Sequence, residues 1–217
     1  MPTPLRAVLF DLDGTLIDSI ALIVAAMDHA FDGFDGPRPS TEEWMLGIGT
    51  PLWLQLADYA RNDEELTRLR DRYRAFQFLH HDRYIRAYPG VAETLAALDA
   101  RGLAMAIVTS KLDQLARRNL DFTGLAKYVP LVIGVEATEK HKPEPEPVLH
   151  ALEQLGVAAG ETVFLGDSPH DVAAGNAAGV ATIAALWGAF TREQLAPAGP
   201  AHWLSDIRAL PGLLDAR

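Results

Sequence analysis

The stretch AVLFDLDGTLIDS, Ala7–Ser19, places an apolar run directly before two acidic residues. The run Ala7–Phe10 has the length and composition of a buried strand, and Asp11 and Asp13 follow it. In an open parallel sheet, ligands bind beyond the carboxyl ends of the strands. Charges placed there face water, a metal or a substrate, so both carboxylates are candidates for a functional site.

The rest of the chain alternates short apolar runs with helical patterns. Such an alternation indicates right-handed β-α-β units and a parallel sheet with helices on both faces. We therefore predict an α/β fold with a Rossmann-like parallel sheet core. The predicted strands are Ala7–Phe10, Leu103–Val108, Leu131–Ile133, Val163–Leu165 and Val180–Ala184. The predicted helices are Val91–Ala100, Leu112–Phe122, Glu146–Leu155 and Asp171–Ala178.

One connection in this pattern is far longer than the others. Residues 17–87 follow the first strand and carry mostly helical signals, although an ordinary connection is short. We predict that 17–87 form an α-helical domain inserted into a core of residues 1–16 and 88–217. The helical signals are a capping box at Ser40–Glu43, a helix start at Thr50-Pro51 and a long amphipathic helix over Glu64–Arg83.

The composition excludes several classes of function. With a net charge of −10, the chain lacks the excess of Lys and Arg that non-specific nucleic-acid binding needs. The absence of cysteine excludes disulfides, thiolate metal sites and cysteine nucleophiles. The most apolar run, IALIVAAM, is too short to span a membrane. We therefore expect a cytoplasmic protein, monomeric or homodimeric, that binds neither nucleic acid nor membranes.

Charged and hydroxyl side chains gather at the predicted strand ends. Several carboxylates in one place repel one another unless a hard cation such as Mg²⁺ lies between them. An ionised Asp can then attack phosphorus, while hydroxyl, ammonium and backbone N–H groups bind the phosphoryl oxygens. A second Asp can protonate the leaving oxygen and later deprotonate water. The side chains concerned are Asp11, Asp13, Thr15, Thr109, Ser110, Lys142, Asp167 and Asp171.

These residues carry a family resemblance. Asp11-Leu-Asp13-Gly14-Thr15, Thr109, Lys142 and the segment Gly166–Asp171, GDSPHD, resemble in order the four motifs of the haloacid dehalogenase-like (HAD) hydrolase superfamily. The likeness covers nearly the whole chain, and residues 17–87 resemble the helical cap domain of such enzymes. The resemblance implies a Rossmann-like core, a Mg²⁺ cofactor and a small phosphorylated metabolite as substrate.

The resemblance also implies a role for each position. Asp11 would be the nucleophile and Asp13 the general acid/base, with Thr109 and Lys142 completing the catalytic set. Mg²⁺ would be held by Asp11, the backbone carbonyl of Asp13 and Asp167, with Asp171 close by. The residues expected to contact phosphate or substrate are Leu12, Asp13, Gly14, Thr109, Ser110 and Lys142 from the core, and Gly49 and Thr50 from the cap.

Within the superfamily, the chain most resembles phosphoglycolate phosphatases and bacterial pyrophosphatase-like members. The segments HKPEPEPV and GDSPHDVAAGNAAG suggest this subgroup, and Leu46–Trp53 is the part of the cap expected to face the site. Asp13 favours phosphate chemistry over carbon–halogen cleavage, since it can protonate a leaving oxygen. Trp44, Trp53 and Phe76–Phe78 are expected in the core of the cap.

Three alternatives stay open. A sugar phosphomutase of the β-phosphoglucomutase type is disfavoured because residues 17–87 contain no lysine, although their arginines could supply positive charge. A receiver-like signalling domain shares a phosphorylatable Asp but lacks such an insertion and the spacing of Asp11 and Asp13. A scaffold without turnover would be expected to have lost one of the groups named above, and none is missing.

Overall fold

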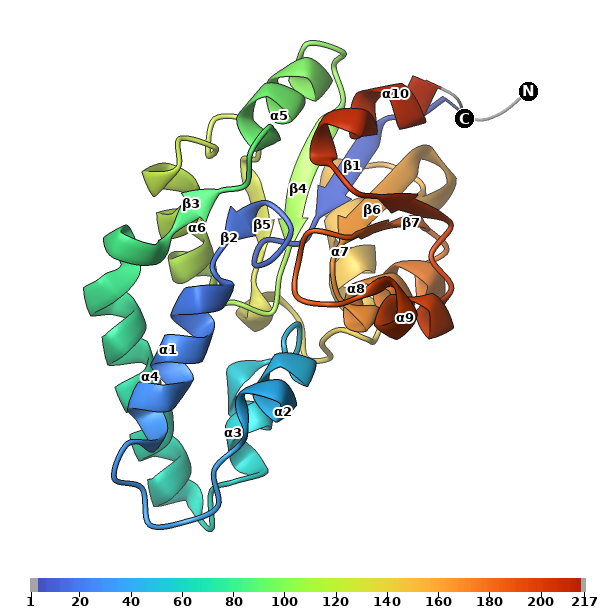
Figure 1. Cartoon of the computed structure of the whole chain (residues 1–217). Helices are drawn as coiled ribbons and strands as arrows, with labels where there is room; N and C mark the ends of the chain where they lie inside the picture. Colours follow the sequence, from blue (N-terminus) through green and yellow to red (C-terminus); the bar gives the residue numbers. More distant parts are fainter. Residues whose placement is uncertain (1–3, 216–217) are drawn as a thin grey trace.

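The structure is a computed structural model that describes residues 4–215. Its main sheet has six strands, and helices surround it (Figure 1). The strand order is β5-β4-β1-β6-β7-β8, and each pair of neighbours is parallel. The predicted α/β fold with a Rossmann-like sheet is therefore confirmed. The strands are β1 (Ala7–Phe10), β4 (Ala104–Val108), β5 (Leu131–Ile133), β6 (Thr162–Gly166), β7 (Ala181–Ala185) and β8 (His202–Leu204).

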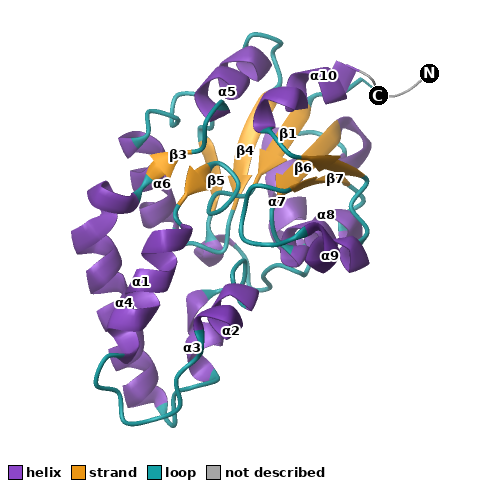
Figure 2. Ribbon diagram, in the orientation of Figure 1, coloured by secondary structure: helices purple, strands orange, loops and turns teal. Residues whose placement is uncertain are grey.

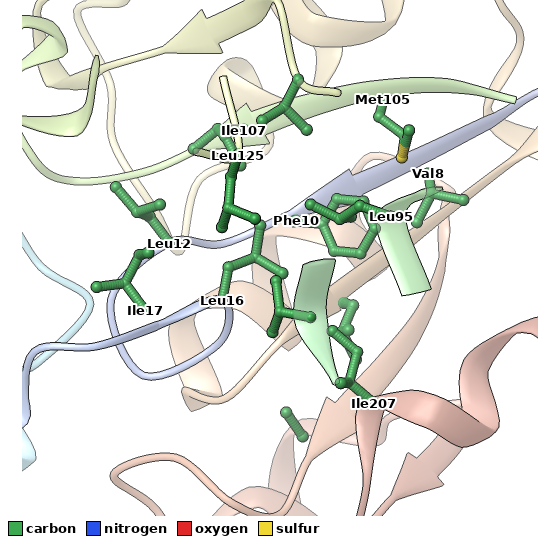
Figure 3. Close-up of a cluster of buried hydrophobic side chains, with 14 of the residues drawn as sticks. Val8, Phe10, Leu12, Leu16, Ile17, Leu95, Met105, Ile107, Leu125 and Ile207 are labelled. Carbon is green, nitrogen blue, oxygen red and sulfur yellow. The ribbon is translucent and has the colours of Figure 1, made fainter. Parts of the chain in front are cut away.

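Helices cover both faces of the sheet (Figure 2). The α-helices are α5 (Val91–Asp99), α6 (Asp113–Phe122), α7 (Glu146–Leu155), α8 (Pro169–Ala177), α9 (Arg192–Leu195) and α10 (Leu210–Asp215). The 3₁₀ turns are η1 (Val135–Ala137), η2 (Ala159–Glu161), η3 (Ala196–Ala198) and η4 (Ile207–Ala209). Val8 and Phe10 pack with Leu95 of α5 (Figure 3), whereas Leu9 packs on the opposite side with residues of α7 and α8. Because both faces are buried, β1 is a continuous apolar run.

The register of the central strands determines what meets at their carboxyl ends. Phe10, the last residue of β1, pairs with Ile107 of β4 and with Leu165 of β6. Paired residues lie side by side, so the loops that follow these three strands leave the sheet at the same edge. Asp11 begins the central one of these loops.

Residues 17–87 leave the core and return to it at one place. β2 (Ile17–Asp18) pairs antiparallel with β3 (Arg86–Ala87), so both ends of the segment lie in one two-stranded ribbon. Between them lie the helices of the segment (Figure 1). These helices contribute Phe31, Trp44 and Leu69 to one buried cluster. The division into two domains stays a prediction, and the ends of the predicted core, 1–3 and 216–217, lie outside the described residues. The helices are α1 (Ile20–Phe31), α2 (Thr41–Leu46), α3 (Leu52–Ala57) and α4 (Asp63–Tyr84).

Of the helix starts predicted within residues 17–87, one is confirmed and one is wrong. The capping box is confirmed: the Glu43 N–H donates to Ser40 Oγ, and the Ser40 N–H donates to the Glu43 carboxylate. The helix start at Thr50 is wrong, because Pro51 is the N-cap of α3 and Thr50 Oγ1 instead donates to the Gly47 carbonyl at 2.7 Å. In the described part of the chain, no helix is long and apolar enough to cross a membrane.

Candidate active site

Three buried carboxylates meet at the carboxyl edge of the sheet. Asp11 follows β1, Asp167 follows β6, and Asp171 lies in the first turn of α8. One oxygen of each lies within 4.8 Å of the others. Burial raises the pKa of Asp11 well above its usual value, against the opposing charge of Lys142. Burial also raises the pKa of Asp167 to about 7, and the adjacent Asp171 carboxylate adds to that rise.

Lys142 is the cation inside this cluster. Its Nζ donates to Asp11 Oδ1 at 2.7 Å, to Asp171 Oδ1 at 2.5 Å and to the Val108 carbonyl at 3.2 Å. Burial alone would lower the pKa of Lys142, but the two carboxylates outweigh it and raise that pKa. One ammonium against three carboxylates leaves an excess of negative charge.

Asp171 is held by the helix that it helps to begin. Ser168 is the N-cap of α8, and its Oγ donates to Asp171 Oδ2 at 2.6 Å. The Ser168 N–H donates to the same oxygen at 3.0 Å, which leaves Oδ1 to Lys142. A capping box thus orients a carboxylate of the cluster.

Asp167 lies against the loop that follows β1. Thr15 Oγ1 donates to its Oδ1 and the Ala189 N–H to its Oδ2, both at 2.8 Å. Gly14 has a φ of +85°, and a Cβ at this position would lie 2.3 Å from Asp167 Oδ2. Glycine is therefore required here both for its positive φ and for the close approach.

Asp13 is not part of the cluster formed by Asp11, Asp167 and Asp171. Its two side-chain oxygens accept from Lys111 Nζ at 2.7 and 2.6 Å, and Oδ1 also accepts from Ser19 Oγ at 2.6 Å. Sequence reasoning missed Lys111. The available signal was its position, since a lysine directly after Thr109-Ser110 stands at the end of a predicted strand.

A cavity of about 90 Å³ lies over Asp11 and Asp13, between the sheet edge and residues 17–87. Gly49 and Thr50 line it, and Ser110 Oγ donates to the Gly49 carbonyl at 2.6 Å across the two parts. The cavity-lining residues are Asp11, Asp13, Ile23, Ile48, Gly49, Thr50, Leu52, Trp53, Gln55, Tyr73, Arg74, Gln77, Thr109, Ser110, Lys111, Leu112, Leu115 and Val135.

The aromatic residues expected in the cap core divide into two groups. Trp44 is buried, as expected, and Phe76 packs partly buried beside the same cluster. The expectation is wrong for Trp53, which lines the cavity, and for Phe78, which is exposed. Both occupy helix faces that only the packing of α3 and α4 could distinguish.

Some of the backbone N–H groups expected to bind phosphate are free to do so, and one is not. In the part of the chain that the structure describes, the N–H groups of Leu12, Asp13 and Ser110 have no hydrogen-bond acceptor. They are available to a ligand at the sheet edge. The Gly14 N–H is not available, because it donates to the Ile17 carbonyl at 2.9 Å. The side chain of Leu12 is buried in the core, so only its backbone can serve.

Comparison with known proteins identifies the family. Residues 8–185 match the family of haloacid dehalogenase-like hydrolases. The chain belongs to this family. The HAD hydrolase is 35% identical to a pyrophosphatase PpaX from Bacillus velezensis over 95% of this chain and 96% of that protein. It is 34% identical to a phosphoglycolate phosphatase from Pseudomonas savastanoi, over 97% of this chain and 80% of that one.

A solved structure gives the same result for the fold of this HAD hydrolase. A hydrolase from Pseudomonas syringae superposes with a TM-score of 0.86 at 28% identity, covering 97% of this chain and 98% of that one. The family resemblance drawn from the motifs is therefore confirmed.

The donor set of this HAD hydrolase fits a hard divalent cation. Asp11, Asp167 and Asp171 offer carboxylate oxygens only, and these are the ligands that Mg²⁺ prefers. The raised pKa values of Asp11 and Asp167 have a common physical cause, which is burial together with negative neighbours. A bound cation would offset the free-energy cost of keeping these buried carboxylates ionised, so the residues present suit a metal.

Proposed function

We propose that this HAD hydrolase is a Mg²⁺-dependent phosphatase that hydrolyses a small phosphorylated metabolite, of the phosphoglycolate or pyrophosphate kind, through an aspartyl-phosphate on Asp11. The observation that carries the proposal is the contact of 2.7 Å between Asp11 Oδ1 and the buried Lys142 ammonium, beside two further carboxylates. The names of the relatives, a pyrophosphatase and a phosphoglycolate phosphatase, support the substrate class.

The chain's own residues supply most of the first step. An oxygen of Asp11 attacks phosphorus, while the bond from phosphorus to the leaving oxygen breaks. Lys142 and the N–H groups of Leu12 and Ser110 stabilise the charge on the phosphoryl oxygens. Asp11, Asp167, Asp171 and the Asp13 carbonyl would hold Mg²⁺. When bound, it supplies charge neutralisation for nucleophile and phosphoryl group.

Asp13 moves the protons in both steps. It donates a proton to the leaving oxygen in the first step and takes one from the attacking water in the second. The oxygen of that water forms the new bond to phosphorus, which releases inorganic phosphate and the Asp11 carboxylate. Thr109, buried at the end of β4, lines the cavity at the point where phosphate would lie.

Residues 17–87 would act as a cap domain. Gly49, Thr50 and Trp53 close the cavity from that side, and closure excludes water during phosphoryl transfer. A cavity of about 90 Å³ suits a substrate of few atoms better than a nucleotide. The β2–β3 ribbon, where both ends of the segment meet, is the place for a hinge.

The test is phosphate release from a panel of 2-phosphoglycolate, pyrophosphate, sugar phosphates and nucleotides, with Mg²⁺ and then with a chelator. We expect activity that needs Mg²⁺ and that is lost in Asp11→Asn but kept in Asp99→Asn, an exposed acid on α5. Acid quenching of the wild type should trap phosphate on the protein, and none should be trapped on Asp11→Asn. Mg²⁺-dependent turnover by Asp11→Asn would contradict the proposal.

A further inference from the structure

Two cations line the cavity but have no part in the proposed chemistry. Lys111 follows β4 on the core side, and Arg74 lies on α4, within residues 17–87. They approach the same small space from its two sides. Lys142 is buried in the carboxylate cluster and is engaged by two carboxylates, those of Asp11 and Asp171. Within the described residues, Lys111 is engaged by one carboxylate only, that of Asp13. Lys111 and Arg74 are therefore the positive charges of the cavity wall.

Lys111 lies on the side of the cavity from which a leaving group would depart. Only 11% of its side chain is exposed, and its Nζ contacts both oxygens of Asp13. Asp13 is the residue proposed to protonate the leaving oxygen. A cation bound to Asp13 would therefore lie next to the leaving group.

Arg74 has no close counter-ion. Among residues 4–215, no carboxylate oxygen lies within ion-pair distance of its guanidinium, although Arg70 on the same helix pairs with Asp71. From outside the helix, the charge of the Glu136 carboxylate attracts the Arg74 guanidinium. That carboxylate is itself engaged, because it accepts from the Asp113 N–H at 3.0 Å. A half-buried guanidinium facing a cavity without a partner costs free energy, which an anionic ligand recovers.

We propose that Lys111 and Arg74 form a subsite for a second anionic group, carried by the leaving part of the substrate. This inference rests on the proposed phosphatase function and narrows its substrates to compounds whose leaving group is itself an anion. Pyrophosphate and phosphorylated hydroxy acids both have this chemistry and both have few atoms. An uncharged leaving group leaves Arg74 without a partner, so the subsite selects against it.

Binding of unreactive ligands tests the subsite without turnover. 3-Phosphonopropionate carries a carboxylate at the position of the leaving group. Propylphosphonate keeps the phosphonate but has an uncharged methyl group at that position, and methylenediphosphonate represents pyrophosphate. Calorimetry on the wild type should show that the two ligands with a second anionic group bind about 10- to 100-fold more tightly than propylphosphonate. Hydrogen bonds between charged groups contribute a binding free energy of this size. Whichever of the two binds more tightly identifies the second group as carboxylate or phosphate.

Three variants of the subsite and two controls complete the test. Lys111→Met and Arg74→Met should each lose most of the preference for ligands with a second anionic group, and Arg74→Lys should retain part of that preference. Arg70→Met, one turn earlier on α4, and the exposed Lys140→Met are matched controls that should retain all of it. Unfolding midpoints show that each variant is folded.

The outcomes separate the two proposals. Equal binding of 3-phosphonopropionate and propylphosphonate by the wild type would overturn the subsite, and so would an unchanged preference in both Met variants. An intact preference that depends on Lys111 and Arg74, in a protein without phosphatase activity, would support the subsite and contradict the proposed function.

Discussion

The ammonium of Lys142 bridges two carboxylates from different parts of the fold: its Nζ lies 2.7 Å from Asp11 Oδ1 and 2.5 Å from Asp171 Oδ1. Asp11 follows β1, and Asp171 begins α8. Since Lys142 comes from the loop before α7, three separate segments are held together by one buried cation. The same contact that orients the proposed nucleophile therefore also stabilises the sheet edge.

Replacing that cation should affect stability and activity together. In Lys142→Met, two buried carboxylates lose their partner, which should cost about 3–5 kcal/mol of unfolding free energy without metal. Phosphate release should fall by about 10²–10³-fold, because a donor to the charged phosphoryl group is lost. Urea unfolding and steady-state kinetics measure the two effects. Lys140→Met is the control, and an equal response of both variants would contradict this role.

Gly14 provides a test of the close approach to Asp167. Gly14→Ala should lower the unfolding free energy by more than the ~1 kcal/mol expected for a positive φ alone, because the new Cβ meets Asp167 Oδ2 at 2.3 Å. Gly33 also has a positive φ, +65°, but no atom lies within 4 Å of a Cβ there. Gly33→Ala is therefore the matched control. If both variants unfold alike in urea, the clash contributes nothing.

The raised pKa of Asp167, about 7, predicts how the metal-free protein responds to pH. Between the ordinary value near 3.8 and about 7, the folded state binds more protons at this residue than the unfolded state. The contribution of Asp167 to the free energy of unfolding is therefore fully present below about pH 3.8, and it is lost as the pH rises through about 7.

The comparison that isolates this effect is the wild type against Asp167→Asn. The difference between their unfolding midpoints should change in favour of the variant as the pH rises from about 4 to about 8. Mg²⁺ should stabilise the wild type more at pH 8 than at pH 5, and should stabilise the variant less. A midpoint difference that does not vary with pH would argue against this assignment.

Asp13→Asn should separate the two steps of the proposed reaction. With p-nitrophenyl phosphate, the leaving group needs little help from an acid, so the first step should be slowed least. The second step needs the base, so the steady-state rate should fall by about 10²–10⁴-fold. Stopped-flow measurements should then show a burst of nitrophenol followed by slow turnover. A uniform slowing without a burst would mean that Asp13 acts only in the first step.

Much of the core could be predicted because its signals are local. β1, β5 and α7 have the predicted ends, since continuous apolar runs and a Gly156 C-cap mark them. β8, in contrast, was not predicted. Only Leu204 of its three residues, His202–Leu204, is buried, and such a short stretch has no periodicity of its own. It becomes a strand because the edge of β7 is there to pair with it.

The sequence by itself determined which chemical groups reach the sheet edge. Asp11 and Asp13 follow directly after a strand and must therefore lie at its carboxyl end, and the same holds for Thr109 and Asp167. Only the tertiary structure decided the partners: Lys111 on Asp13, Arg74 in the cavity, and Trp53 beside it instead of in the core. The physical reason is the distance along the chain over which each interaction acts. Strand and helix signals act between neighbours in the chain, whereas an ion pair across a cavity depends on how the separate elements pack.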